Sequence, residues 1–307
     1  MRTFDAPLLA PPAFAGPLHD VARRVLARHP EYAMYRAGVS SAREYHAFVE
    51  RIAPELVAGG VPAAEVHFVK RYPRDAQAFV RDALAQLARA GIVPDAAPQQ
   101  CPPAAALAAV ADYDHGGYGT FIYPEEGLLL FALADVLRAR SAIFLGSYYG
   151  YWAACAMPAI AAHGGRAVLV DPDPRVSAVA RRNHARYGDA VRVETATGAG
   201  FLRAADDTFD LVVIDAELPR SHPDPDEAGK AIYRGLLRDV LPHCAPRAHV
   251  VCHNILFEDA TDDPYLAGIV ARNERELGPF RALVARELDG FAELASTEGV
   301  GVGVRSR

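Results

Sequence analysis

Glycines and one acidic residue frame a short loop whose chemistry suits a bound ligand. Gly146 and Gly150 enclose Ser147 and Tyr148 in the run GSYYGY, and Asp171 follows further along the chain. Glycine lets the backbone approach a ligand closely, and a helix that begins after such a loop offers free N–H donors. An acid at the end of the next strand is able to accept both hydrogen bonds of a ribose diol. The spacing therefore predicts a nucleotide-binding loop.

The stretch 141–173 supplies the elements that would position this loop. An apolar run at 142–145 precedes it, an alanine-rich helical segment continues to about residue 162, and a second apolar run at 167–170 ends in the acid. Strand, loop, helix and strand form the first unit of an α/β sheet. The dinucleotide pattern GxGxxG is absent, and tyrosines stand where a pyrophosphate would need the backbone, so the loop favours a ligand without phosphates over NAD.

A second group of polar residues follows two later apolar runs. Asp215 ends one run, and His253 and Asn254 end the next. Since the carboxyl ends of neighbouring parallel strands meet at one edge of a sheet, we expect the three side chains to converge. They suit Mn²⁺, Fe²⁺ or Zn²⁺ better than Mg²⁺. Without a metal, His253 has the chemistry of a general base, and it also fits a strand-end histidine bonded to the backbone.

The order of apolar runs predicts the architecture. Helical spacing is seen in three segments of the first hundred residues, and strand-like alternation is not seen there. The segment 94–105 is rich in proline and predicts a linker. We therefore expect a helical domain at 1–103, acting as a cap or a dimerisation arm, and an α/β domain at 104–307.

The second domain continues the alternation of strand and helix. Five parallel strands with helices between them, closed by two antiparallel strands, predict a seven-stranded Rossmann-like sheet in three layers. The expected strands after the first unit are 191–194, 209–214 and 249–252, with 281–287 and 300–304 as the closing pair. The expected helices are 18–29, 42–57, 74–90, 104–113, 128–137, 174–187, 228–241 and 264–277.

Composition excludes several classes of protein. The chain has 307 residues with a net charge of −6, which argues against a nucleic-acid-binding surface. Its four cysteines form no CxxC pair, which fits a reducing compartment. We see no signal peptide and no apolar run of transmembrane length. We therefore expect a soluble, cytoplasmic protein that binds neither nucleic acid nor membrane.

From about residue 118 to 305, the order of these features resembles a class I S-adenosylmethionine-dependent methyltransferase. Within that class the chain is most similar to the catechol and caffeoyl-CoA O-methyltransferase group, on the run PEEG at 124–127, the pair Gly150-Tyr151 and the acid Asp171. The resemblance implies that Thr197 meets the adenine and that Asp215 and Asn254 bind a metal. The cofactor contacts it implies are Gly146, Ser147, Tyr148, Gly150, Asp171, Thr197, Asp215 and Glu126.

Three positions depart from the pattern of this group. Phe144 stands where an acid usually lies near the methionine end of the cofactor, and His253 replaces a second metal-binding carboxylate. Leu218 stands where the catechol enzymes have a catalytic lysine. A mechanism that needs both the metal and the lysine is therefore incomplete in this chain.

The resulting prediction is S-adenosylmethionine-dependent methyl transfer to an oxygen or nitrogen of a small molecule, in specialised biosynthesis. We expect His253 and Asp215 to be catalytic, and Asp215, His253 and Asn254 to hold any divalent metal. We expect a homodimer. Two alternatives remain at this stage: cyclisation of the aminobutyrate arm of the same cofactor, and a non-catalytic cofactor-binding scaffold.

Overall fold

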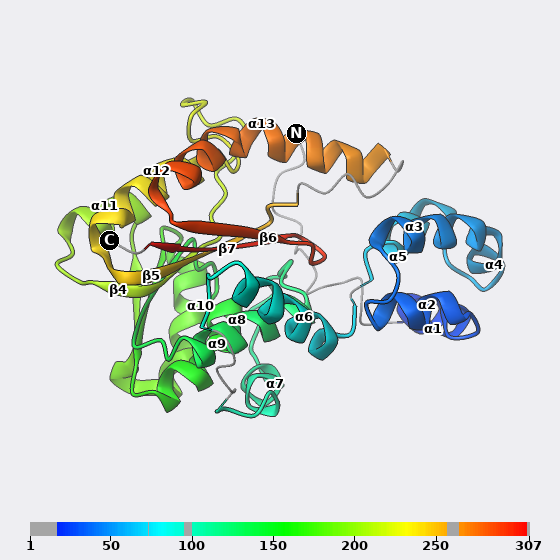
Figure 1. The fold of residues 1–307 in the computed structure, drawn as a ribbon, viewed down its shortest axis with the longest axis horizontal. Coiled ribbons are helices and arrows are strands. Elements are labelled where there is room, and N and C mark those ends of the chain that lie inside the picture. Colours follow the sequence, from blue (N-terminus) through cyan, green and yellow to red (C-terminus); the bar gives the residue numbers. More distant parts are fainter. Residues whose placement is uncertain (1–16, 73, 95–99, 257–263, 306–307) are drawn as a thin grey trace.

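Figure 1 shows a computed structural model of the protein, which describes residues 17–72, 74–94, 100–256 and 264–305. A seven-stranded sheet runs through the molecule in the order β3-β2-β1-β4-β5-β7-β6. Its strands are β1 (Ser141–Leu145), β2 (Arg166–Asp171), β3 (Val191–Thr195), β4 (Phe209–Ile214), β5 (Cys244–His253), β6 (Gly290–Leu294) and β7 (Val300–Arg305). The first five pair in parallel, and β7 pairs antiparallel with β5 and β6. The predicted fold is confirmed.

Helices cover both faces of the sheet (Figure 1). One face carries α6 (Ala76–Arg89), α7 (Ala104–Val110), α8 (Pro124–Val136), α9 (Tyr151–Ala162) and α10 (Pro174–His184). The other carries α11 (Gly198–Ala204), α12 (Ile232–Val240) and α13 (Pro264–Glu287). The central strands are apolar on both sides because each side packs against helices. Of the described helices, none is both long and apolar enough to cross a membrane.

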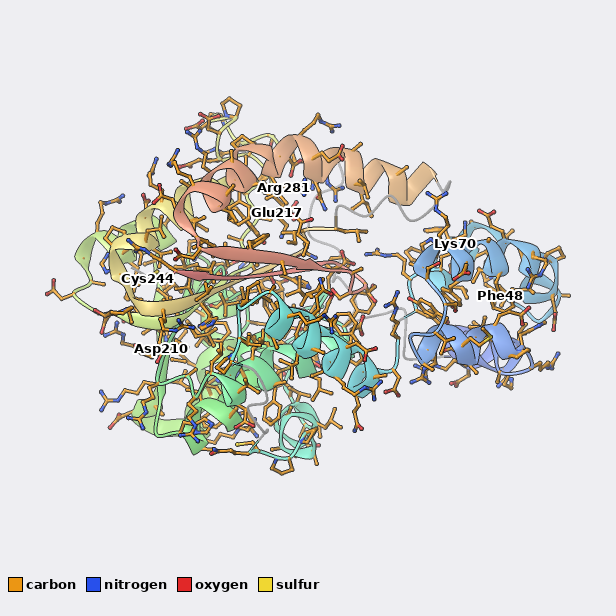
Figure 2. The ribbon with its side chains drawn as sticks, viewed as in Figure 1. Phe48, Lys70, Asp210, Glu217, Cys244 and Arg281 are labelled. Atoms are coloured by element: carbon orange, nitrogen blue, oxygen red, sulfur yellow. The ribbon has the colours of Figure 1, made fainter. Side chains whose placement is uncertain are left out.

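A separate group of short helices precedes the sheet. These are α1 (Pro17–Leu26), α2 (Pro30–Arg36), α3 (Ala42–Arg51), α4 (Ala53–Ala58) and α5 (Val66–Val69). Their buried side chains, among them Phe48, form a core of their own. Figure 2 shows Phe48 and Lys70 at the opposite end of the molecule from Asp210 and Cys244, which lie at the beginnings of β4 and β5. The helices therefore lie toward the carboxyl end of β5.

The apolar face of α6 packs with α8 and the sheet rather than with α1–α5. By packing, the change from the helical group to the α/β core thus falls between α5 and α6. The predicted division at residues 103/104 stays a prediction about independent domains. α3 begins with a capping box, in which the Ser41 hydroxyl accepts from the Glu44 N–H and the Glu44 carboxylate accepts from the Ser41 N–H.

The predicted strand at residues 281–287 is wrong. These residues form the last turns of α13, and the strand that pairs with β7 is β6, at Gly290–Leu294. Leu277, Phe280 and Val284 recur at helical spacing and are buried against the sheet. The helix also continues through Pro279. Burial of this apolar stripe outweighs the resemblance of the short apolar run at 282–285 to a strand.

Candidate functional site

The loop after β1 is held where only glycine fits. Gly146 has φ 77°, and a Cβ atom there would lie 2.5 Å from the Cα atom of Ala216. The N–H groups of Gly146 and Ser147 both donate to the carbonyl of Val170, at 3.0 and 3.1 Å. The loop is therefore pressed between the ends of β2 and β4. The hydroxyl of Ser147 is buried and has no hydrogen-bond partner among the described residues.

The far end of the loop is anchored by a buried histidine. Gly150 precedes α9 with φ 85°, and a Cβ there would lie 2.8 Å from Nε2 of His184. That nitrogen donates to the Gly150 carbonyl at 3.0 Å, while the Tyr113 hydroxyl donates to the carbonyl of Tyr149 at 2.7 Å. Burial lowers the pKa of His184 to about 4, so the ring is neutral at physiological pH.

Asp171 lies beside this loop, as predicted. One carboxylate oxygen accepts from the N–H of Tyr148 at 3.0 Å, and the other accepts from the N–H of Asp173 at 2.9 Å. Burial raises the pKa of Asp171, against the effect of these two donors. Each oxygen keeps a lone pair for a ligand hydroxyl. Tyr148 has φ 50° and an exposed ring, a strained conformation for a side chain of this size.

Thr197 lies at the carboxyl edge just beyond β3. Its hydroxyl accepts from the N–H of Gly200 at 3.1 Å and caps the N-terminus of α11. The side chain is exposed near the end of the strand next to Asp171. The structure thus gives Thr197 a structural task, and its contact with adenine stays a prediction.

The structure brings Asp215, His253 and Asn254 together with a fourth residue that the sequence analysis missed. Lys230 is buried, and its Nζ lies 2.9 Å from the side-chain oxygen of Asn254 and 3.4 Å from Oδ1 of Asp215. The other oxygen of Asp215 lies 3.4 Å from Nδ1 of His253. Although burial opposes ionisation, the His253 and Lys230 cations lower the pKa of Asp215 to about 2. Lys230 and Lys70 are the only lysines in the chain. This rarity is the one feature of the sequence that could have drawn attention to Lys230.

His253 is enclosed between two carboxylates. Its Nε2 lies 2.9 Å from Oε2 of the fully buried Glu126, on the side away from Asp215. Burial favours the neutral ring, but Glu126 and Asp215 together raise the pKa of His253 to about 9. An imidazolium has no lone pair with which to accept a proton. This geometry therefore supports a positioning role for His253 in place of the predicted general base.

Glu126 faces the core near His253. Its Oε1 accepts from the Ser296 hydroxyl at 2.7 Å and from the Glu298 N–H at 2.8 Å, and its Oε2 accepts from the Tyr123 N–H at 2.9 Å. These bonds tie the start of α8 to the loop between β6 and β7. The predicted contact between Glu126 and a cofactor stays untested, and its side chain already has partners on both oxygens.

The donor set at the end of β4 and β5 does not fit a divalent metal. Oδ1 of Asp215 and Oδ1 of Asn254, which a metal would need, both face the ammonium of Lys230. The imidazole of His253 is bonded through Nε2 to Glu126. A metal ligand must be deprotonated and free of a competing cation. The three predicted ligands are therefore engaged with other residues of the chain.

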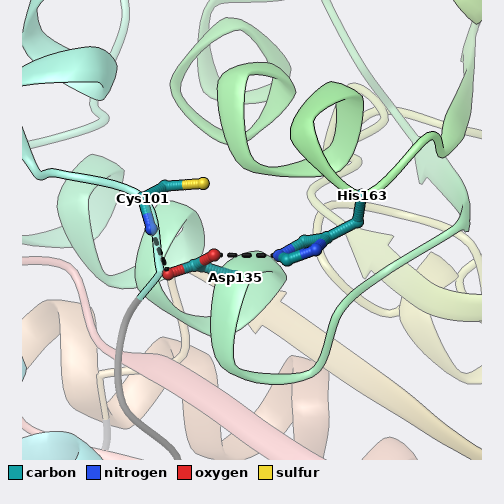
Figure 3. Close-up of side chains that lie close together, drawn as sticks. All are labelled: Cys101, Asp135 and His163. Carbon is teal, nitrogen blue, oxygen red and sulfur yellow. Dashed lines mark hydrogen bonds and ion pairs between the residues drawn. The ribbon is translucent and has the colours of Figure 1, made fainter.

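Another cluster with metal-binding residue types lies elsewhere. Among the described residues, Cys101, Asp135 and His163 are the His, Cys, Asp or Glu side chains that converge in a group of three (Figure 3). Asp135 accepts from the N–H groups of Gln100 and Cys101 at 2.6 and 2.9 Å, and from Nε2 of His163 at 2.9 Å. Asp135 and His163 end helices that precede β1 and β2, so the cluster lies at the amino edge of the sheet, opposite the loop.

The comparisons agree with this geometry. Residues 143–255 match the family model described as a methyltransferase domain. A catechol O-methyltransferase of Niastella koreensis is 31% identical over 107 residues, which are 32% of this chain and 47% of that protein. The chain thus matches about half the length of that curated relative.

Solved structures match over a larger share of the chain. A methyltransferase of Podospora anserina with bound S-adenosylhomocysteine superposes with a TM-score of 0.52 at 16% identity, covering 74% of this chain and 96% of that one. An O-methyltransferase structure from Klebsiella pneumoniae gives 0.50 at 17% identity, with coverage of 76% and 99%. At these identities the likeness shows the fold.

Proposed function

We propose that this chain carries a class I S-adenosylmethionine-dependent methyltransferase domain and that it methylates a hydroxyl oxygen of a small molecule. One observation carries the proposal. The order β2-β1-β4-β5 sets Asp171, the glycine loop and the Asp215–Lys230–Asn254 cluster side by side along one edge of the sheet. Ligands of open α/β sheets bind along this edge.

The cofactor would lie over the glycine loop. The free lone pairs of Asp171 suit the ribose hydroxyls, and the absence of a side chain at Gly146 leaves the backbone of the loop open to the cofactor. When S-adenosylmethionine is bound it supplies an activated methyl group: the acceptor oxygen forms the new C–O bond, the C–S electron pair stays on sulfur, and the hydroxyl proton passes to water. The residues of the chain bind and orient the two reactants.

The acceptor would lie against the ends of β4 and β5. Asp215 is a quarter exposed there while Lys230 and His253 are buried behind it, so a hydroxyl bound at Asp215 meets a carboxylate backed by two cations. A curated relative is named a catechol O-methyltransferase, which makes vicinal phenols the first acceptors to test. The proposal also includes a nitrogen atom as the acceptor and a role in specialised biosynthesis.

The helices α1–α5 would act as a cap over the acceptor. The guanidinium of Arg71, which follows α5, forms a buried ion pair with Glu298 in the β6–β7 loop. Glu298 in turn accepts from the side-chain amide of Asn254 at 3.3 Å. The helical group is thus joined to the acceptor end of the site through one chain of contacts. Its use as a dimerisation arm, in a homodimer, stays a prediction.

Calorimetric titration with S-adenosylhomocysteine tests the cofactor site. Asp171→Ala removes the proposed ribose acceptor and should weaken binding by about 100-fold or more, since two hydrogen bonds to a charged group contribute about 3 kcal/mol at least. Asp173→Ala is the matched control, because the Asp173 carboxylate caps α10 by accepting from the Arg175 N–H, and the substitution keeps the backbone N–H that donates to Asp171. Equal affinities of Asp171→Ala and the wild type would overturn the proposed cofactor site.

A further inference from the structure

Lys230 occupies the place that a divalent cation would need. Its side chain is 5% exposed, and Nζ lies 2.9 Å from Oδ1 of Asn254, 3.0 Å from the Tyr233 hydroxyl and 3.4 Å from Oδ1 of Asp215. Asp and Asn oxygens are the ligands of hard divalent cations. Here they surround an ammonium instead.

The position of this ammonium is fixed by the fold. The Tyr233 hydroxyl donates to the carbonyl of His253 at 2.9 Å, so its oxygen is left to accept from Lys230. The backbone N–H of Lys230 donates to Glu276 of α13 at 2.9 Å. Gly229, just before it, has φ 61°, and a Cβ there would collide with the Glu276 carboxylate at 2.4 Å. Both the backbone and the side chain of Lys230 are therefore held.

The charged side chains around Lys230 are already paired with one another. Asp215 is paired with Lys230 on one oxygen and faces His253 on the other, and Glu126 pairs with His253. A metal entering between Asp215 and Asn254 would meet the ammonium at contact distance. Displacement of Lys230 would leave a buried, unpaired cation, which is strongly unfavourable.

We propose that the Lys230 ammonium takes the place of the divalent cation at this edge, so that methyl transfer by this protein is independent of metal. The inference rests on the proposed function. Lys230 is a positioning residue: it holds Asp215 and Asn254 at the strand ends, and it acts on the acceptor through these two side chains.

Manganese binding tests whether the Lys230 ammonium takes the place of a metal ion, without reference to activity. Electron paramagnetic resonance of added Mn²⁺ should show no ion at Asp215 in the wild type. Lys230→Ala should gain a bound ion that Lys230→Ala/Asp215→Asn loses, which separates this place from the Cys101–Asp135–His163 cluster. An ion in the wild type that Asp215→Asn removes would overturn the inference. So would the absence of an ion in folded Lys230→Ala, as judged by circular dichroism.

Methyl transfer to a vicinal phenol tests the consequence. The wild type should keep its rate in excess EDTA. Lys230→Met should lose about 100-fold in kcat, because Asp215 and Asn254 lose the cation that holds them in place. Lys230→Arg should recover part of the lost rate. Its pH–rate profile should resemble that of the wild type more closely than the profile of Lys230→Met does. Arg286→Met, which removes an exposed cation from the last turn of α13, should leave the rate unchanged.

Two results of the activity assay would contradict the inference. One is loss of wild-type transfer in EDTA with recovery on addition of Mn²⁺ or Mg²⁺. The other is a full rate in Lys230→Met. If no transfer occurs under any condition, the proposed function fails, and the manganese experiment alone then decides whether Lys230 fills a cation site.

Discussion

Nε2 of His253 lies 2.9 Å from Oε2 of Glu126, across 127 residues of sequence. This contact joins the end of β5 to the first turn of α8, and both side chains are almost fully buried. It explains why a histidine at the predicted catalytic edge carries a proton at neutral pH. Because His253 also faces Asp215, Glu126 helps to position Asp215 through His253.

Removal of the Glu126 carboxylate should destabilise the protein strongly. Glu126→Gln leaves the His253 cation with one partner, and breaking a buried ion pair costs about 3 to 5 kcal/mol. Urea unfolding monitored by circular dichroism measures the change in free energy of unfolding.

Glu125→Gln is the control for this change. Burial and the neighbouring Glu126 raise the pKa of Glu125, so the side chain is already close to the neutral amide in charge. We expect a loss of about 1 kcal/mol or less. Equal losses in the two variants would contradict the assignment of Glu126 as the partner of the His253 cation.

The anchor of the glycine loop should give the protein an acid-sensitive stability. The folded pKa of His184, about 4, lies below its ordinary value of 6.5, so the unfolded chain binds a proton first as pH falls. The stability that the neutral ring contributes is present above pH 6.5 and is lost as pH falls toward 4. The loss amounts to about 3 kcal/mol over this window.

Urea unfolding at a series of pH values from neutral to acid measures this loss. His184→Gln keeps an N–H donor for the Gly150 carbonyl and removes the titration, so its unfolding free energy should fall less over the same window. Parallel curves for the variant and the wild type would show that another group is responsible.

Gly146→Ala should damage the loop more than a positive φ alone explains. Gly146 and Gly164 both have positive φ, at 77° and 69°, so alanine at either site costs about 1 kcal/mol in backbone strain. At Gly146 the new methyl group also meets the backbone of Asp215 and Ala216, whereas at Gly164 it meets nothing within 4 Å. We expect Gly146→Ala to lose binding of S-adenosylhomocysteine and Gly164→Ala to retain it, by calorimetry. Retention by both would mean that the loop is not the cofactor site.

The ion pair that joins the helical group to the β6–β7 loop should affect both stability and the acceptor. Arg71→Met leaves the buried Glu298 carboxylate unpaired beside Asn254, at a cost of about 3 to 5 kcal/mol. If α1–α5 form a cap, the variant should also raise the KM for the acceptor with little change in kcat.

Arg51→Met is the matched control for Arg71→Met. Its partner Glu31 and Arg51 itself are both largely exposed, so the pair contributes about 1 kcal/mol or less. An unchanged KM in a folded Arg71→Met protein would argue against the cap.

Much of the fold could be predicted because each layer leaves its own pattern. Apolar runs such as 209–214 match a buried parallel strand, and the order of runs and helices gives the topology. The strand predicted at 281–287 is wrong because the short apolar run at 282–285 resembles a strand, while the apolar stripe that makes the segment helical begins at Leu277.

The site could be predicted only in part. Asp171, Asp215 and His253 could be placed at one edge of the sheet, because each of them ends or follows a strand and the strands are parallel neighbours. Lys230 lies 15 residues beyond Asp215, after a loop closed by the bridge between Leu218 and Gly229, and no periodicity places such a residue. The protonation of His253 depends on Glu126, a contact over 127 residues that only packing creates.

The most direct test of the proposed function is mass spectrometry of the cofactor after incubation with S-adenosylmethionine, in excess EDTA, with and without vicinal phenols. The account predicts S-adenosylhomocysteine and a methylated phenol, formed together and only when an acceptor is present. Methylthioadenosine that forms without any acceptor would contradict methyl transfer and indicate cyclisation of the aminobutyrate arm.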